Sequence, residues 1–341
     1  MTKCAIGGLR HIRRLGAGAL SGALVCVGCG EDSQGSGGDA PTTTAATTTT
    51  DATSGSTNTS TNASSTTGGM VTTDFQAGDP RPVTVHVPSS YDPATPTPLL
   101  ILLHGYTATG AVQNAYFGLE PVAEERGIIY AYPDGTTDTQ DSQFWNATDA
   151  CCNFYGSNVD DVAYLMGLVD EITTKVNVDP KRIFFVGHSN GGFMSYRLAC
   201  EASDRIAAIV SLAGATFEDP ADCDAPAALS VLQIHGDMDD TVLYAGGTFG
   251  AAYPSAAEST SYFATRANCS VPAMSTGQTT DIDGNIDGPM DENETTIDAY
   301  ADCDAGYGVE LWTIPGGGHV PALAPGFADK VVDFLMAHPK P

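Results

Sequence analysis

The chain has 341 residues, with 14 Lys or Arg against 41 Asp or Glu and a formal net charge of -27. The basic residues Lys3, Arg10, Arg13 and Arg14 all precede Cys29, so the rest of the chain carries 10 basic and 41 acidic residues, a net charge of -31. Phosphate backbones repel such a chain, which excludes nucleic acid as a partner.

Residues 1–28 predict an exported protein. The basic residues precede an apolar run from Leu15 to Val27, which is typical of a secretory signal and short for a membrane span. The run ends in Val25-Cys26-Val27-Gly28-Cys29, which resembles the cleavage box of bacterial lipoproteins. The resemblance implies lipidation at Cys29, and membrane contact only through that anchor. Secretion after ordinary cleavage nearby is the alternative.

Residues 29–72 are mostly Thr, Ser, Gly, Ala and Asp, with 13 Thr between Pro41 and Gly69. So little of this segment can be buried that we expect a disordered tether. Residues 73–341 are then the part able to build a core. Their length suits one large α/β domain as well as two small ones.

Apolar runs of strand length alternate with helical patterns along residues 73–341. An alternating stretch at 83–87 predicts an early edge strand. Further strands are expected at 98–103, 127–132, 182–186, 207–212, 230–234 and 309–314, and helices at about 111–126, 160–177, 190–203, 256–267 and 326–337. This alternation predicts a mostly parallel central sheet flanked by helices, with functional groups beyond the carboxyl ends of the strands.

The string Gly187-His188-Ser189-Asn190-Gly191 follows one predicted strand and opens a predicted helix. It fits G-x-S-x-G, the tight turn that presents a serine hydroxyl at a sheet edge. A Cβ at either glycine would collide with the neighbouring element. We therefore predict Ser189 as a nucleophile, with a purely structural turn as the alternative.

A serine hydroxyl needs a positioned imidazole to take its proton, and the chain has seven histidines. His319 lies in a loop between the last strand and the last helix, where the chain order Ser, Asp, His places the base. The other histidines lie in the signal, in the tail, beside the serine, in the edge strand or at strand ends. The orienting carboxylate should follow an intervening strand, and Asp237, Asp239 and Asp240 all do.

Several motifs occur in order along the chain. They are His104-Gly105-Tyr106, Cys151-Cys152, Val159-Asp160-Asp161-Val162, Gly187-His188-Ser189-Asn190-Gly191-Gly192, His235-Gly236-Asp237-Met238-Asp239 and Gly317-Gly318-His319. This set resembles the extracellular polyhydroxybutyrate depolymerase and feruloyl esterase group of α/β-hydrolases, which implies that fold over about residues 80 to 340. The group's H-G-x-x-D pattern falls on Asp239, which implies Asp239 rather than Asp237 as the acid. The group often has Trp-Pro after its histidine, whereas this chain has Val320-Pro321.

Acyl transfer also needs N–H donors for the negative charge that develops on the carbonyl oxygen. We expect them from the backbone of Asn190, next after the serine, and of Tyr106. Phe144, Trp145 and Tyr155, together with Tyr106, are candidates for an aromatic wall around the substrate. Ordinary packing is the alternative for these side chains.

Six cysteines follow Cys29, at 151, 152, 200, 223, 269 and 303, an even number that predicts three disulfides in an oxidising compartment. Cys269 and Cys303 bracket a polar insertion and are expected to close it. Cys151 and Cys152 would then pair with Cys200 and Cys223. A zinc site is disfavoured because these six cysteines include no C-x-x-C pair.

Within the polar insertion, Asp283, Asn285, Asp287 and Glu294 match the spacing of a calcium loop. No flanking helix pair is evident, so a solvated loop closed by a disulfide is the favoured interpretation and calcium the alternative. No other metal or cofactor is expected.

The sequence thus predicts a monomeric serine carboxylic-ester hydrolase that is exported and either lipid-anchored or secreted. Ser189 attacks the ester, His319 relays the proton and Asp239 orients His319. The substrates expected are polyhydroxyalkanoate oligomers, feruloyl or acetyl esters, or small esters. A peptidase on the same fold and a non-catalytic binding lipoprotein are the alternatives.

Overall fold

The computed structural model describes residues 71–286, 293–304 and 306–341. They belong to the second of two units into which the chain divides, Met1–Ala63 and Ser64–Pro341. The predicted signal, Cys29 and nearly all of the predicted tether lie outside the described residues, as does Asp287. Within the described ranges, no helix combines the length and the apolar character needed to cross a membrane.

The strands and helices alternate along the described chain. The strands are β1 (Phe75–Ala77), β2 (Val83–His86), β3 (Thr97–Leu103), β4 (Ile129–Ala131), β5 (Thr136–Thr137), β6 (Gln143–Phe144), β7 (Val178–His188), β8 (Ala208–Leu212), β9 (Ser230–Gly236), β10 (Gly247–Thr248), β11 (Ala252–Tyr253), β12 (Ser270–Thr280), β13 (Thr295–Ala301) and β14 (Val309–Ile314). The helices are α1 (Gly110–Phe117), α2 (Leu119–Arg126), α3 (Asp161–Lys175), α4 (Asn190–Glu201), η1 (Pro220–Asp222), α5 (Ala256–Arg266) and α6 (Phe327–Ala337).

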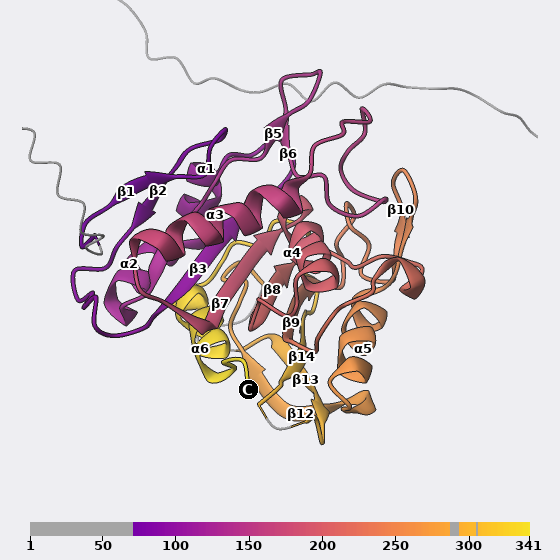
Figure 1. Cartoon of the computed structure of the whole chain (residues 1–341). Helices are drawn as coiled ribbons and strands as arrows, with labels where there is room; N and C mark the ends of the chain where they lie inside the picture. Colours follow the sequence, from indigo (N-terminus) through magenta and orange to yellow (C-terminus); the bar gives the residue numbers. More distant parts are fainter. Residues whose placement is uncertain (1–70, 287–292, 305) are drawn as a thin grey trace, which may run out of the picture. The chain divides into compact units, whose positions relative to one another are not determined.

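Ten strands form the central sheet, in the order β1-β2-β4-β3-β7-β8-β9-β14-β13-β12 (Figure 1). Every pairing from β4 to β14 is parallel, and the pairings outside that block are antiparallel. The predicted mostly parallel sheet is therefore confirmed. Because the parallel strands all end at one edge, the loops after β7, β9 and β14 meet there.

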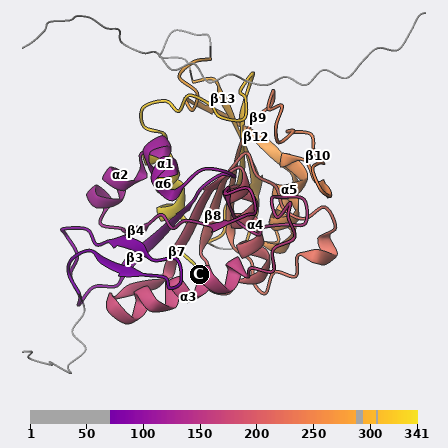
Figure 2. The same ribbon diagram turned by 90° about the horizontal axis from the view of Figure 1, so that it is seen from above.

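Helices cover both faces of the sheet (Figure 2). In β3, all of whose residues are buried, Leu99, Ile101 and Leu103 face a core shared with α3, α4 and α5. Leu100 and Leu102 face the opposite core, shared with α1, α2 and α6. The period of two in strand side chains explains why β3 is an unbroken apolar run.

Two predicted elements differ from the structure. The helix expected over 111–126 is divided at Gly118, whose φ of 65° ends α1 in a left-handed conformation that glycine adopts at low cost. The insertion expected as a solvated loop instead forms the antiparallel strands β12 and β13 at the sheet edge. Most side chains of β12 are exposed, so its sequence lacks the apolar pattern of a core strand.

The structure corrects two of the expected disulfide pairings. Cys269 and Cys303 are bonded, as expected, and join the start of β12 to the end of the β13 segment. Cys200 of α4 bonds to Cys223 after η1, whereas Cys151 and Cys152 bond to each other. The prediction that Cys151 and Cys152 would pair with Cys200 and Cys223 was wrong. After β8 the chain returns to α4 through η1, and this brings Cys223 to Cys200. The spacing of the cysteines along the sequence does not reveal this contact.

Candidate active site

Ser189 occupies the turn between β7 and α4. Its φ of 53° and ψ of -119° lie outside the regions that residues with a side chain ordinarily adopt. A Cβ at Gly187 would lie 2.1 Å from the Gly191 carbonyl oxygen, and one at Gly191 would lie 2.2 Å from that of Leu103. Glycine is therefore required on both sides of the serine, as predicted, and the turn presents Ser189 at the carboxyl end of β7.

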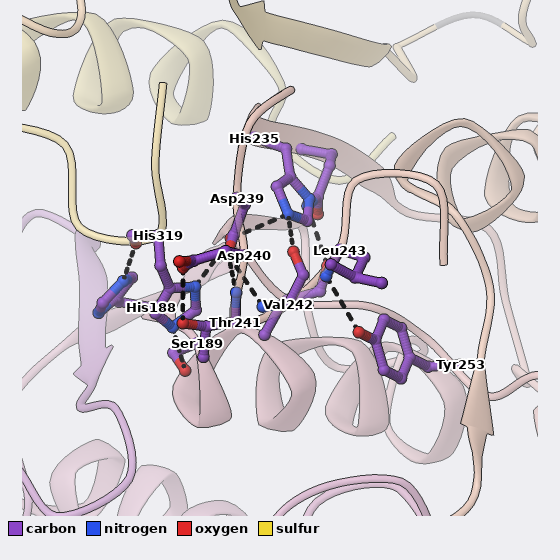
Figure 3. Close-up of polar contacts among 12 residues, drawn as sticks. His188, Ser189, His235, Asp239, Asp240, Thr241, Val242, Leu243, Tyr253 and His319 are labelled. Carbon is purple, nitrogen blue, oxygen red and sulfur yellow. Dashed lines mark hydrogen bonds and ion pairs between the residues drawn. The ribbon is translucent and has the colours of Figure 1, made fainter. Parts of the chain in front are cut away.

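Three side chains from three strand ends form a hydrogen-bonded series (Figure 3). His319 Nε2 lies 2.9 Å from Ser189 Oγ, and His319 Nδ1 lies 2.8 Å from Asp239 Oδ2. With a neutral imidazole, Nδ1–H donates to the carboxylate and Nε2 accepts the serine O–H. The arrangement can therefore remove the proton of Ser189 as its oxygen attacks.

Asp239 is held as an ionised, oriented carboxylate. Its Oδ1 accepts the backbone N–H groups of Thr241 and Val242, at 2.8 and 2.9 Å. Burial by itself would raise the pKa of Asp239, but the hydrogen bonds from His235 and His319 outweigh it and hold that pKa well below its usual value. The charge faces His319, where an imidazolium would form.

His235, the first residue of the H-G-x-x-D pattern, contacts that carboxylate. The amide of Gln233 donates to His235 Nδ1 at 3.1 Å, so the ring proton lies on Nε2. This Nε2 lies 2.8 Å from the Val242 carbonyl oxygen and 3.2 Å from Asp239 Oδ2. The sequence interpretation placed His235 at a strand end and gave it no part in the site. The four-residue spacing to Asp239 within one motif was a signal for this contact.

The other two candidate aspartates point elsewhere. Asp237 Oδ1 accepts the N–H of Gly316 at 2.6 Å and ties the loop after β9 to the loop after β14. Asp240 is exposed and bonds to the hydroxyl of Thr241. Of the three, Asp239 is the one that contacts His319, in agreement with the assignment that the H-G-x-x-D pattern implies.

His188 supports the loop that carries His319. It is buried, and its Nε2–H donates to the carbonyl oxygen of His319 at 2.9 Å. Burial, with a smaller contribution from His319, lowers the pKa of His188 to about 4. His188 is therefore neutral at pH 7 and acts as a hydrogen-bond donor.

We expect the protein to lose stability as the pH falls from 6.5 to 4, because unfolded His188, with an ordinary pKa of 6.5, binds a proton before the folded residue does. The contribution of His188 to the free energy of unfolding is greatest above pH 6.5, and about 2 kcal/mol of it is lost by pH 5. His188→Gln keeps a donor but does not titrate, so it should lose correspondingly less between pH 7 and pH 5 in urea unfolding. Equal losses in the two proteins would contradict this account.

Two backbone N–H groups near Ser189 are available for an oxyanion. Gly105 packs against the serine, since a Cβ on Gly105 would lie 3.5 Å from Ser189 Cβ. The N–H groups of Tyr106, the next residue, and of Asn190, the first residue of α4, donate to no acceptor within the part of the chain that the structure describes. Their oxyanion role stays a prediction that this geometry permits.

A cavity of about 430 Å³ lies beside Ser189 and His319. Its other walls are mostly apolar and include Tyr106, Ala108, Val112, Gln113, Tyr116 and Val320. The sequence interpretation included Tyr106 but missed the contribution of α1. Val112 and Tyr116 lie one helical turn apart, and Val320 directly follows His319. Both spacings are visible in the sequence and could have indicated these residues as parts of the cavity wall.

The rest of the predicted aromatic wall is wrong. Phe144 and Trp145 are 1% and 0% exposed, Tyr155 is 51% exposed, and none of the three lines the cavity. The indole of Trp145 donates to the His104 carbonyl oxygen at 3.1 Å. The backbone N–H and C=O of Trp145 both bond to the Asn190 side chain, at 2.7 and 3.0 Å. Trp145 thus fixes its loop to the start of α4 from within the core.

Two carboxylates of the predicted calcium loop accept hydrogen bonds from backbone N–H groups. Glu294 Oε1 accepts two N–H groups, one of them from Asp283, and Asp283 Oδ1 accepts those of Asn285 and Ala322. Asp287 lies outside the described residues. Among the residues that can be described, no group of three or more His, Cys, Asp or Glu side chains could hold a metal ion. Calcium binding stays a prediction.

The fold and this site define an α/β-hydrolase. A family model described as "Alpha/beta hydrolase family" matches residues 100–331, a range that includes all three residues of the Ser189–His319–Asp239 series. The chain therefore belongs to the alpha/beta hydrolase family.

Known relatives and structures agree with this membership. The chain is 29% identical to feruloyl esterase B of Piromyces equi over 242 residues, which cover 70% of this chain and 42% of that protein. It is 30% identical to poly(3-hydroxybutyrate) depolymerase of Ralstonia pickettii over 133 residues, covering 36% of this chain and 27% of that protein. The chain thus matches less than half the length of either relative. Acetyl xylan esterase from Aspergillus awamori has the same fold, with a TM-score of 0.55 at 15% identity over 78% of this chain and 99% of that one.

Proposed function

We propose that this protein is a serine carboxylic-ester hydrolase that acts through an acyl-enzyme. The observation that carries the proposal is the series Ser189–His319–Asp239, with bonds of 2.9 and 2.8 Å, at the wall of an apolar cavity. Ser189 Oγ attacks the ester carbonyl while His319 takes its proton, and the N–H groups of Tyr106 and Asn190 receive the oxyanion. His319 then protonates the leaving alcohol, and water releases the acid by the same steps.

The names of the relatives point to esters of feruloyl, acetyl or hydroxyalkanoyl groups. Among these, the cavity of about 430 Å³ favours acyl groups of modest size. Three disulfides fit a protein that works outside the cytoplasm, and the Cys29 box supports export with a lipid anchor. These further attributes belong to the proposal, as does the monomeric state.

Hydrolysis of p-nitrophenyl acetate and butyrate, beside the matched p-nitroanilides, tests the reaction class. We expect both esters to be hydrolysed and a fluorophosphonate probe to attach to Ser189, as mapped by peptide mass spectrometry. Faster cleavage of the anilides would favour the peptidase alternative. Intact esters and an unlabelled protein would favour the binding lipoprotein.

A further inference from the structure

Trp145 bonds to both segments that supply the proposed oxyanion donors. Its indole N–H donates to the His104 carbonyl oxygen at 3.1 Å, two residues before Tyr106. Its backbone N–H donates to Asn190 Oδ1 at 2.7 Å, and its carbonyl oxygen accepts from Asn190 Nδ2 at 3.0 Å. A backbone N–H only donates and a carbonyl oxygen only accepts, so both ends of the Asn190 amide are assigned. Trp145 thus links the loop after β3 to the start of α4.

The side chain of His104 extends this link to the peptide that carries the Tyr106 N–H. Gly135 N–H donates to His104 Nε2 at 2.8 Å, so the ring proton lies on Nδ1. This Nδ1–H donates to the Gly105 carbonyl oxygen, also at 2.8 Å. A peptide unit is planar and trans, so the Gly105 C=O and the Tyr106 N–H point in opposite directions. Fixing that carbonyl group therefore fixes the direction of the Tyr106 N–H.

The supporting groups are buried and bonded, whereas the two donors are free. Trp145, His104 and Asn190 are all fully buried, where no water can take the place of a lost hydrogen-bond partner. The backbone N–H groups of Tyr106 and Asn190 donate to no acceptor in the described ranges. Each free donor is therefore attached to a fully bonded support, and the two supports meet at Trp145.

Oxyanion donors must stand in the right geometry before the reaction, and small displacements of such groups are costly in rate. Resting on the ester hydrolysis proposed above, we propose that Trp145 is a positioning residue that sets the separation of the Tyr106 and Asn190 N–H groups. Trp145 does not line the cavity beside Ser189, so it makes no contact with a substrate there. Its effect is confined to stabilisation of the oxyanion, and the initial binding of an ester does not depend on it.

The test uses a ketone that forms the same oxyanion. Ser189 Oγ adds to the carbonyl carbon of butyl trifluoromethyl ketone, the serine proton passes to His319, and the carbonyl oxygen becomes negatively charged. Butyl methyl ketone has a similar shape but forms no stable adduct, because it lacks the electron-withdrawing fluorines. The inhibition constants of the two ketones therefore report separately on the oxyanion and on binding without it.

Trp145→Phe removes the indole N–H and keeps an aromatic ring. We expect it to lower kcat/KM for p-nitrophenyl butyrate by about tenfold and to weaken binding of the trifluoromethyl ketone by the same factor. The inhibition constant of butyl methyl ketone should not change. Asn190→Ala breaks the link from the other side and keeps the backbone N–H, so it should give the same pattern.

The other tryptophan of the chain provides the matched control. Trp312 lies within β14, and its indole N–H donates to Glu310 Oε2 at 2.7 Å. Trp312→Phe makes the same chemical change without touching either oxyanion donor. It should keep kcat/KM and both inhibition constants within a few-fold of wild type.

An unchanged inhibition constant for the trifluoromethyl ketone in Trp145→Phe or Asn190→Ala would overturn the proposal. So would an equal loss of affinity for butyl methyl ketone, or the same losses in Trp312→Phe, because the effect would then not be specific to the oxyanion. If one variant fails to fold by circular dichroism, the other decides on the same criteria. A wild-type protein that neither hydrolyses p-nitrophenyl butyrate nor binds the trifluoromethyl ketone would refute the ester hydrolase proposal itself, so the two failures are distinguishable.

Discussion

Ser189→Ala is expected to lower kcat for p-nitrophenyl butyrate by about 10,000-fold or more, while the protein stays folded. The hydroxyl is the atom that would form the acyl-enzyme, and no other described side chain bonds to His319 Nε2. Any residual rate would come from water attack on an ester still held at the N–H groups of Tyr106 and Asn190. Burst kinetics should vanish with the nucleophile, and the fluorophosphonate probe should no longer attach.

A serine in the helix that begins directly after Ser189 provides the control. Ser195 is buried in α4, and its hydroxyl donates to the Gly191 carbonyl oxygen at 2.9 Å, away from His319. Ser195→Ala makes the same chemical change within α4 and should keep kcat within a few-fold of wild type. Equal rates for wild type and Ser189→Ala would refute the proposed mechanism.

Asp239→Asn is expected to lower kcat by about 1,000-fold to 10,000-fold with little change in fold. Oδ1 of Asp239 receives two backbone N–H groups, so the asparagine oxygen would take that place. The asparagine NH2 would then face His319 Nδ1, which must become an acceptor. The ring proton moves to Nε2, and His319 can no longer take the proton of Ser189.

The neighbouring aspartate allows a matched comparison. Asp237→Asn makes the same chemical change two residues away, where the carboxylate bonds to Gly316 N–H and not to His319. It should cost less than tenfold in kcat. A larger loss in Asp237→Asn than in Asp239→Asn would show that the orienting carboxylate has been misassigned.

Much of this architecture could be predicted because its causes are local. The run at 98–103 is apolar because β3 is buried on both faces. The apolar side chain at each position is itself the signal of that burial. Gly187 and Gly191 flank Ser189 because a side chain at either position would strike backbone within about 2 Å. His319 is placed by being in the loop after the last parallel strand. The sequence therefore predicts which strands the functional residues follow, the tight turn at Ser189 and the position of His319 in the loop after the last strand.

Packing across the chain was not predictable in the same way. Trp145 and Phe144 have the aromatic side chains expected of a pocket wall, but they are buried in the core. Cys151 and Cys152 pair with each other, whereas Cys223, where the chain returns to α4, pairs with Cys200. The direction in which a side chain points depends on what packs beside it, and residues distant in sequence supply those neighbours.

The sequence by itself therefore determined the α/β class, the serine turn, the placement of His319 and the acidic, cysteine-paired character of the chain. These features follow from the burial period of single elements, from backbone sterics and from charge, which each residue carries with it. Only the tertiary structure decided that Asp239 contacts His319 while Asp237 does not, and that α1 walls the cavity. These features depend on distances between loops of separate strands, which exist only once the sheet has formed.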